Sequence, residues 1–539
     1  MRSFALILCL GLSACGGGGS PSIQSQASSS MLPPPINTSI ANTTPNNPST
    51  NSITSGASTS SSNTGASSPS SGGTTSNTIT IGSISTQPIT SLCNGNPSNA
   101  FTPTAPATAS YTQPTTSGLS SINQVNVSTQ SGANNIIPLC VGADRVSVSA
   151  NIPQISLTIC VPGTSTCQTI DHILVDTGST GLFLFSKQTQ GVLDLAATPL
   201  PQAKDSNGNL LYDCMAYGGN SNAGGTYIAD VYLNGSHYAT QQTIGVFGTV
   251  ENQASQLCSF NKNANQTIND YVLSNPQTQQ VGLGFNGILG VGALKPSIDD
   301  SSTLSCNSQF QCTPFNWYNG TNLHGYSNIL AQLNNDSNGF GLSIPSPSIN
   351  VNGGFNGQAL QGQLILGINT QTDNQVSVAQ KIMTLIQPSS LTVIPSGFLN
   401  ASLEQSTAQV LVDSGTNGIL ISSTFASYFA GLGITPTQPS NAISALQVAS
   451  STQQQTFSLT LTDAAQNTST QSLSLTTNTV INPLWQSGVI PDFGFFFTNS
   501  NTAQNIILGI PFFMGKTIWF LEAGGTNPSS NEQGAGIYF

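Results

Sequence analysis

Short stretches of alternating apolar and polar residues, separated by turns rich in Gly, Asn and Pro, run from about residue 141 to Phe539. The segment Arg145–Cys160 alternates in this way, as a half-buried β-strand does. A turn follows it, and Cys167–Gly178 predicts a second strand. Because such strands and turns continue to the C-terminus, we expect a mainly β globular part of about 400 residues.

The N-terminal residues lack this pattern. In residues 1–15, Arg2 precedes a short apolar run, and small residues precede Cys15. The arrangement resembles a bacterial lipoprotein signal, in which the cysteine becomes the lipidated first residue. A plain secretory signal with an incidental cysteine is the alternative. Residues 16–139 contain no charged residue and few aromatic residues, so we expect a disordered tether.

Charged residues are scarce in the whole chain. It has 8 basic and 19 acidic residues, and its formal charge is −11. One basic residue lies in the leader, and the others are too few to build the positive groove that nucleic acids require. Glu, Lys and Arg are nearly missing, which argues against a long helical bundle. No stretch beyond the leader is apolar over transmembrane length, so membrane attachment is expected only through the lipid.

The chain has 10 cysteines, of which Cys9 lies in the leader and Cys15 is the lipidation candidate. The even number that remains in an exported chain indicates disulfides. The candidate pairs are Cys160 with Cys167, Cys306 with Cys312 and, on chain order alone, Cys93 with Cys140 and Cys214 with Cys258. Because the sequence has no CxxC motif and only 3 histidines, we expect neither a metal site nor a cofactor.

An apolar strand followed by an Asp-containing turn occurs twice. Residues 173–186 (ILVDTGSTGLFLFS) align with residues 410–423 (VLVDSGTNGILISS). Each copy is followed later by an apolar Ile-Leu-Gly segment, which ends at Gly290 in the first case and at Gly509 in the second. Two ordered pairs of segments predict two homologous lobes.

Each copy presents a carboxylate, Asp176 or Asp413, on a turn with flanking hydroxyl residues. The apolar strand anchors the turn, and the glycine permits close backbone approach. If the lobes pack about a pseudo-twofold axis, the two carboxyl groups meet. Two such groups within hydrogen-bonding range do not both ionise easily, so they share a proton and titrate as a unit. One can then take a proton from water while the other donates one to a carbonyl oxygen.

The order of motifs from residue 152 to 539 resembles that of the pepsin-like aspartic peptidases. The matching segments are Asp176-Thr177-Gly178-Ser179 and Asp413-Ser414-Gly415-Thr416 for the two catalytic motifs, 215–235 for the flap hairpin, 285–290 and 506–513 for the Ile-Leu-Gly segments, and 362–368 for the strand at the lobe crossover. The resemblance implies a bilobal fold with a catalytic cleft between the lobes.

The resemblance also implies a role for each matching residue. Asp176 and Asp413 would hold and activate the water. The supporting residues would be Thr177 and Ser414, which cross-brace the turns, Gly178 and Gly415 within the turns, and Ser179 and Thr416, which donate to the outer carboxylate oxygens. Tyr217 would close over the substrate as the flap tyrosine, and the pH optimum would be acidic.

The sequence departs from the family pattern in several places. Ser414 stands where Thr is commoner, and Asn286 stands where Asp is usual. Residues 299–358, rich in Asn, Gly and Ser, look like an insertion that would change the walls of the cleft.

We therefore expect an aspartic-type endopeptidase in four parts. These are a signal peptide at 1–15, a tether at 16–139, an N-terminal lobe with flap and insertion at 140–358, and a C-terminal lobe at 359–539. It would act as a monomer on protein or peptide substrates at the bacterial cell envelope, lipid-anchored, in the outer membrane or at the cell surface. One alternative is a catalytically silent peptidase fold that serves as a surface binding protein. Another is an adhesin with a Ser/Thr-rich stalk, which leaves the repeated motif unexplained.

Overall fold

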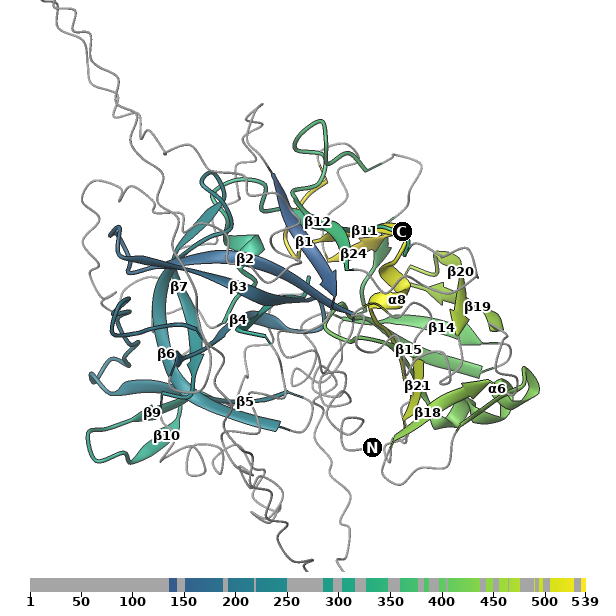
Figure 1. Ribbon diagram of the computed structural model, residues 1–539, viewed down its shortest axis with the longest axis horizontal. Helices are drawn as coiled ribbons and strands as arrows, with labels where there is room; N and C mark the ends of the chain where they lie inside the picture. Colours follow the sequence, from purple (N-terminus) through teal and green to yellow (C-terminus); the bar gives the residue numbers. More distant parts are fainter. Residues whose placement is uncertain are drawn as a thin grey trace, which may run out of the picture. The chain divides into compact units, whose positions relative to one another are not determined.

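The structure is a computed structural model of the 539-residue chain. It describes residues 135–142, 151–187, 192–217, 220–249, 285–293, 303–315, 326–347, 359–376, 382–386, 397–403, 406–436, 443–448, 455–463, 465–475, 489, 494–497, 505–527 and 535–539. This part of the chain is mostly β structure, as the alternating pattern predicted (Figure 1).

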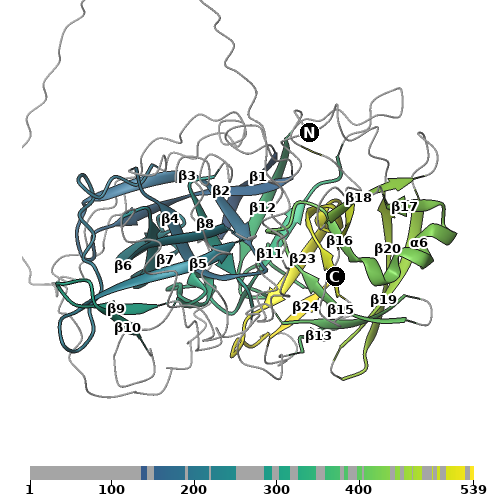
Figure 2. The same cartoon turned by 90° about the horizontal axis from the view of Figure 1, so that it is seen from below.

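Within the described residues, the larger sheet contains 15 strands in the order β10-β9-β5-β6-β7-β4-β8-β3-β2-β1-β12-β11-β23-β24-β13. The strands are β1 (Ile136–Gly142), β2 (Ile152–Cys160), β3 (Cys167–Asp176), β4 (Thr180–Phe185), β5 (Leu210–Tyr217), β6 (Asn220–Tyr232), β7 (Tyr238–Phe247), β8 (Gly287–Val291), β9 (Leu304–Cys306), β10 (Cys312–Pro314), β11 (Gly339–Ile344), β12 (Leu360–Leu366), β13 (Met383–Thr384), β23 (Lys516–Leu521) and β24 (Gly536–Tyr538). Strand β23 lies beside β11, and β24 lies beside β23 (Figure 2).

The smaller sheet has 9 described strands in the order β17-β18-β21-β16-β22-β15-β14-β19-β20. They are β14 (Leu399–Leu403), β15 (Ser406–Val412), β16 (Ile419–Ser422), β17 (Ile434–Pro436), β18 (Ile443–Val448), β19 (Gln455–Thr462), β20 (Thr468–Leu475), β21 (Gly494–Phe497) and β22 (Asn505–Leu508). The described helices are short: the 3₁₀ turns η4 (Ile329–Gln332) and η5 (Ser423–Phe425), and the α-helices α6 (Ala426–Gly431) and α8 (Ile510–Phe513). No helix among these residues is long and apolar enough to cross a membrane.

The sequence repeat is matched by a repeated pattern of strand pairing. In the larger sheet, β3 and β4 flank β8, which is parallel to β3 and antiparallel to β4, and β7 runs parallel to β4 on its other side. In the smaller sheet, β15 and β16 flank β22 with the same directions, and β21 runs parallel to β16. The order β7-β4-β8-β3 is thus repeated as β21-β16-β22-β15, and each copy carries one aspartate motif.

The strands do not follow the expected division at residue 358. Four strands beyond it, β12, β13, β23 and β24, belong to the larger sheet with the N-terminal strands. The start of the globular part also lies earlier than residue 140. Ile136–Gly142 forms β1, because Ile137 and Leu139 are buried and the strand pairs with β12. Residues 135–139 are therefore part of the fold and not of the tether.

β2 was expected to be half-buried, but it is buried along nearly its whole length. Ile155, Leu157 and Ile159 of β2 pack in the main hydrophobic cluster, and Ile152 packs in a second cluster, so side chains from both parts of the strand are buried. The alternation of residue types therefore predicted the strand correctly and its environment wrongly.

The two short-range disulfides are confirmed. Cys160–Cys167 joins β2 to β3 across their hairpin turn, and Cys306–Cys312 joins β9 to β10 in the same way. Cys140 is disulfide-bonded as well. Cys93, its expected partner, and Cys258, the expected partner of Cys214, lie outside the described residues, as does the side chain of Cys214.

Candidate active site

Asp176 is the last residue of β3 and lies on a turn that its own neighbours stabilise. β3 is buried at this end and pairs in parallel with β8, so the core fixes the position of the carboxyl group. The backbone N–H of Gly178 donates to Asp176 Oδ1 at 2.7 Å, and the Ser179 hydroxyl donates to Oδ2 at 2.5 Å. Both carboxyl oxygens therefore have a donor from the same turn.

Asp413 has the same surroundings in the smaller sheet. It follows β15, and its N–H donates to the carbonyl oxygen of Leu508 in β22 at 3.0 Å. The N–H of Gly415 donates to Asp413 Oδ1 at 2.8 Å, and the Thr416 hydroxyl donates to Oδ2 at 2.6 Å. The two motifs thus hold their carboxyl groups with equivalent donors at equivalent oxygen atoms.

The residues after the two aspartates bind the opposite turn. Thr177 donates its hydroxyl to the carbonyl oxygen of Val412 at 2.9 Å, and Ser414 donates its hydroxyl to that of Val175 at 2.7 Å. Each hydroxyl oxygen also accepts the other residue's backbone N–H, at 2.9 Å for Thr177 Oγ1 and 3.0 Å for Ser414 Oγ. Both side chains are fully buried. Four hydrogen bonds therefore fix the two turns against each other.

This bracing brings the carboxyl groups of Asp176 and Asp413 within hydrogen-bonding range of each other. Asp176 is 7% exposed and Asp413 is 1% exposed. Burial and the adjacent negative charge of Asp176 hold the pKa of Asp413 well above its usual range. Asp413 therefore keeps its proton at pH values where an isolated aspartate is ionised.

The glycines of the two turns permit this approach because they lack a side chain. A Cβ atom on Gly178 would lie 2.5 Å from Cγ of Asp413, which is far inside van der Waals contact. A Cβ atom on Gly415 would overlap the carboxyl group of Asp176 in the same way. Each glycine thus faces the carboxyl group that belongs to the other motif.

Residues that follow the two Ile-Leu-Gly segments donate hydrogen bonds to the backbone of the two turns. The carbonyl oxygen of Ser179 accepts the N–H of Gly292 at 2.8 Å, and that of Thr416 accepts the N–H of Ile510 at 2.9 Å. Gly292 lies two residues after the first Ile-Leu-Gly segment, and Ile510 lies one residue after the second. The second element of the sequence repeat therefore contacts the first in both sheets.

Asn286, which stands where the family usually has Asp, contacts β3 and not the carboxyl pair. Its Nδ2 donates to the carbonyl oxygen of Asp171 at 2.9 Å and to Asp171 Oδ1 at 3.0 Å. The neighbouring residue His172 has a φ of 53°, and the pairing of β2 with β3 is irregular near this point. The side chain of Asn286 thus secures an irregular part of the strand that leads to Asp176.

The segment expected to be the flap is a hairpin. β5 and β6 are antiparallel, and their last pair joins Tyr217 to Asn220. The side chain of Tyr217 lies outside the described part of the structure, so its role stays a prediction. At its other edge β5 pairs with β9, which belongs to the expected insertion at 299–358. The disulfide-linked hairpin β9–β10 therefore extends the sheet that carries the flap segment.

One contact beside the second motif was not anticipated. Asn417 directly follows Thr416, and its carbonyl oxygen accepts Nδ2 of Asn151 at 2.9 Å. Both asparagines are buried, and Asn151 has a φ of 59°. The tolerance of Asn for this left-handed conformation is the one signal that the sequence offers for Asn151, and it does not reveal the partner.

His237 and Asp336 form a buried hydrogen-bond network away from the carboxyl pair. His237 is fully buried, and its Nε2 lies 2.8 Å from Oδ2 of Asp336. Oδ2 of Asp336 also accepts Nε2 of Gln371, and its Oδ1 accepts the hydroxyl of Thr370. His237 thus has the satisfied polar position expected of a core histidine. Among the described residues, no group of three or more His, Cys, Asp or Glu is placed to hold a metal ion.

Several predicted features lie outside the described residues. They are the signal peptide, Cys15, and the tether up to residue 134. The eight residues of the two motifs are all described, and the structure brings them together at one place.

A family model matches residues 131–539 of the chain, and its description is a protein of unknown function, DUF3443. No curated protein matches the sequence. The match covers most of the chain and includes both aspartate motifs and every described residue. The chain therefore belongs to the DUF3443 family.

Proposed function

We propose that this protein is an aspartic-type endopeptidase, which hydrolyses peptide bonds with a water molecule activated by Asp176 and Asp413. The observation that carries the proposal is the symmetric, buried carboxyl pair with one turn donor on each of the four oxygens. A solitary buried aspartate is usually structural. Two that face each other from duplicated turns, and that share a proton, are arranged for acid–base chemistry.

The reaction follows from the shared proton. The ionised carboxylate accepts a proton from water, and the water oxygen attacks the carbonyl carbon of the peptide bond. The protonated carboxyl group donates its proton to the carbonyl oxygen, which gives a neutral tetrahedral diol. The protonated carboxyl group then donates its proton to the leaving nitrogen while the ionised one takes a proton from a hydroxyl of the diol. The C–N bond breaks, a carboxylic acid and an amine are released, and the pair is restored. No covalent bond to the protein forms, and the proton count of the pair is the same before and after.

The surroundings of the pair suit this role. The donors from Gly178, Ser179, Gly415 and Thr416 stabilise the negative charge that one carboxyl group must carry. The bracing by Thr177 and Ser414 keeps the geometry fixed, so that little reorganisation is needed during the reaction. The substrate class proposed is therefore an extended polypeptide whose carbonyl group can reach between the two aspartates.

The wider setting is also a proposal. The repeated strand order supports a pepsin-like arrangement of two lobes with a cleft at the aspartate pair. Tyr217, at the end of the β5–β6 hairpin, would cover the substrate. The N-terminal sequence supports attachment to the bacterial envelope by a lipid on Cys15, with residues 16–134 as a spacer. A monomeric enzyme is part of the same proposal. An acid-active enzyme would then work at the cell surface.

An activity assay of the exported, oxidised protein tests the proposal. Unfolded casein is incubated with the protein between pH 3 and 8, beside the variants Asp176→Asn and Asp413→Asn. Asp194→Asn is the matched control, because the Asp194 side chain is solvent-accessible and bonds to Lys187 and to the backbone of Ala196 and Ala197, away from the carboxyl pair. We expect cleavage by the wild type and the control, and none by the two pair variants.

A pepstatin-type inhibitor, which binds an assembled aspartate pair, gives a second readout. Binding together with cleavage supports the proposal. Absence of cleavage at every pH, in a folded protein that does not bind the inhibitor, would overturn it in favour of a silent binding protein.

A further inference from the structure

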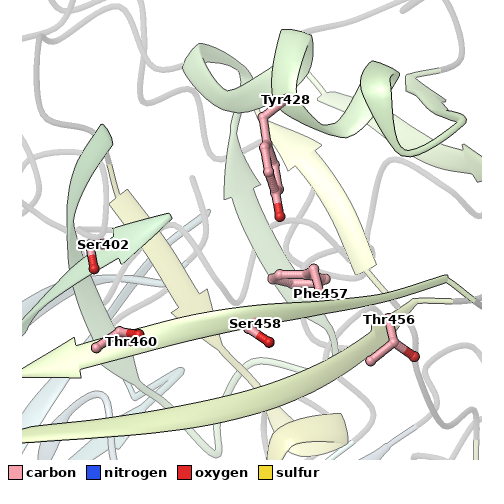
Figure 3. Close-up of a pocket in the computed structure, with 6 residues that line it drawn as sticks. All are labelled: Ser402, Tyr428, Thr456, Phe457, Ser458 and Thr460. Atoms are coloured by element: carbon pink, nitrogen blue, oxygen red, sulfur yellow. The ribbon is translucent and has the colours of Figure 1, made fainter. Parts of the chain in front are cut away.

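A cavity of about 480 Å³ lies between the short helix α6 and the strands β14 and β19 of the smaller sheet (Figure 3). Tyr428 extends from α6 toward Phe457, which is buried. Thr456 and Ser458, the hydroxyl residues on either side of Phe457, are exposed and lie on the opposite face of β19. Because the ring and the hydroxyls face apart, the cavity defines no set of groups that would select a ligand. A contact in the larger sheet bears on the aspartate pair instead.

The segment expected to be the flap leaves the larger sheet at Gly224. From Gly224 onward β6 pairs with β7, whereas Asn220–Ala223 pair only with β5 among the described strands. A Cβ atom on Gly224 would overlap the carbonyl oxygen of Val246 in β7, so β6 lies tightly against β7 where their pairing begins. The base of the flap hairpin therefore lies at Gly224.

Thr226, two residues after Gly224, bonds to a tyrosine from another part of the chain. Its side chain is fully buried, and its Oγ1 lies 2.8 Å from the hydroxyl oxygen of Tyr326, which is 5% exposed. Buried hydroxyl groups need hydrogen-bond partners, so this contact is a stable part of the fold. Tyr326 belongs to residues 299–358, which were expected to change the walls of the cleft. This segment therefore reaches the base of the flap hairpin.

The same tyrosine packs against the strand that follows the first aspartate motif. The ring centroids of Tyr326 and Phe183 in β4 are 4.7 Å apart. Gly181 of β4 has a φ of 99°, and a Cβ atom on it would lie 2.7 Å from the Cβ atom of Tyr326. Only a glycine permits this approach. Gly181 comes two residues after Ser179, whose hydroxyl donates to Asp176. Tyr326 thus contacts both the strand that leaves the turn of Asp176 and the base of the flap hairpin.

We propose that Tyr326 is a positioning residue, which fixes the base of the β5–β6 hairpin relative to β4 and the first aspartate motif. Phe183 holds its ring, and its hydroxyl holds Thr226. Because one side chain contacts both elements, a shift of the hairpin base would break either the ring contact or the hydrogen bond. The inference rests on the proposed function, since the position of the hairpin matters for catalysis only if the hairpin covers a substrate.

The rival explanation is that Tyr326 only fills space in the aromatic cluster. Tyr326→Phe separates the two explanations, because it keeps the ring and removes the hydroxyl. Thr226→Val removes the other partner of the same bond with little change of shape, and Thr226→Ser retains the hydroxyl. Tyr238→Phe is the matched control, because Tyr238 pairs with Tyr232 at the other end of the β6–β7 pairing from Gly224.

The first readout is hydrogen exchange of the backbone amides in the whole oxidised protein, measured by mass spectrometry, which needs no activity. We expect Tyr326→Phe and Thr226→Val each to speed exchange in Asn220–Thr226 by about two- to tenfold, the effect of one lost hydrogen bond. The double variant should exchange no faster than either single variant, because both changes remove the same bond. Thr226→Ser and Tyr238→Phe should exchange at the wild-type rate.

The second readout is steady-state cleavage of fluorescein-labelled casein. Tyr326→Phe should raise KM by a similar factor and change kcat less, because the carboxyl pair itself is untouched. Unchanged exchange in both hydroxyl-deleting variants would overturn the role of Tyr326, even in an active enzyme. Faster exchange spread over the whole protein would also overturn it, because that result indicates only lost stability. Faster exchange in the hairpin alone, in a protein that cleaves no casein, would support the role of Tyr326 and count against the peptidase proposal.

Discussion

Thr177 and Ser414 each accept the backbone N–H of the other, at 2.9 and 3.0 Å, although they follow strands of different sheets. Each also donates its hydroxyl to the strand that carries the other motif. The two hydroxyls thus link the backbones of the two turns, and these backbones position the carboxyl pair.

Removing the hydroxyl of Ser414 should destabilise the fold. Ser414→Ala leaves the buried N–H of Thr177 without its acceptor and the carbonyl oxygen of Val175 without its donor. Each buried unsatisfied group costs about 1 to 3 kcal/mol. Urea unfolding measures the loss. Ser414→Thr retains the hydroxyl and should be close to the wild type, and equal stability of the Ala and Thr variants would contradict the assignment.

Side chains at the turn glycines should abolish activity. In Gly178→Ala, the new Cβ would overlap the carboxyl group of Asp413, so the pair must separate. Casein cleavage by this variant is expected to fall at least about a hundredfold, the scale on which small displacements in an active site act. Gly431→Ala is the control, since a Cβ there meets nothing within 4 Å. Full activity of Gly178→Ala would show that the carboxyl pair is not the catalytic group.

The alkaline limb of the pH–rate profile should respond to Thr416. Burial and the charge of Asp176 raise the pKa of Asp413, and the Thr416 hydroxyl opposes this shift by stabilising the ionised form. Thr416→Val removes that hydroxyl, so the shared proton should persist to higher pH and the alkaline limb of kcat/KM should move upward. Thr416→Ser keeps the hydrogen bond and should leave the limb in place. A downward shift for the Val variant would refute the role of this bond.

Glu522 should make the protein less stable as pH rises. It is 4% exposed, its Oε1 accepts Nδ2 of Asn328 at 2.5 Å, and burial raises its pKa well above the ordinary 4.5. Below pH 4.5 the folded and unfolded states both hold the proton. Above it, the unfolded state releases its proton first, so unfolding becomes more favourable until the folded group also ionises.

Glu522→Gln keeps an acceptor for Asn328 but does not ionise. Its free energy of unfolding, measured by urea titration at several pH values above 4.5, should fall less steeply with pH than that of the wild type. Asp413 contributes in the same direction, so part of the slope should remain. Identical slopes for the variant and the wild type would mean that Glu522 does not hold its proton in the folded protein.

The local features of the fold could be predicted from the sequence because their signals are local. The turn between Cys160 and Cys167 predicted a clamped hairpin, and the repeated motif predicted two equivalent turns. The long-range features could not be predicted. Nothing near Leu360–Leu366 shows that this strand joins Ile136–Gly142, because its pattern of apolar residues would suit a place in either sheet.

The same distinction holds for the site. Asp176 and Asp413 could be proposed as partners because the repeat makes their turns equivalent. The contact of Asn151 with Asn417 has no such repeat, and a single asparagine before a strand has many common roles in turns. The cavity beside Tyr428 was missed because it depends on the packing of a short helix against a strand, and no motif records that packing.

The reciprocal bonds of Thr177 and Ser414 also make each half of the site depend on the other half. A fragment with one motif would keep the donors to its own carboxyl group but would lose the hydroxyl that satisfies its backbone N–H. Such a fragment is complete only when a second copy binds it, as subunits do across a twofold symmetric interface. In the present chain each half of the site is thus completed by the other half, in the way that one subunit of a homodimer completes its partner.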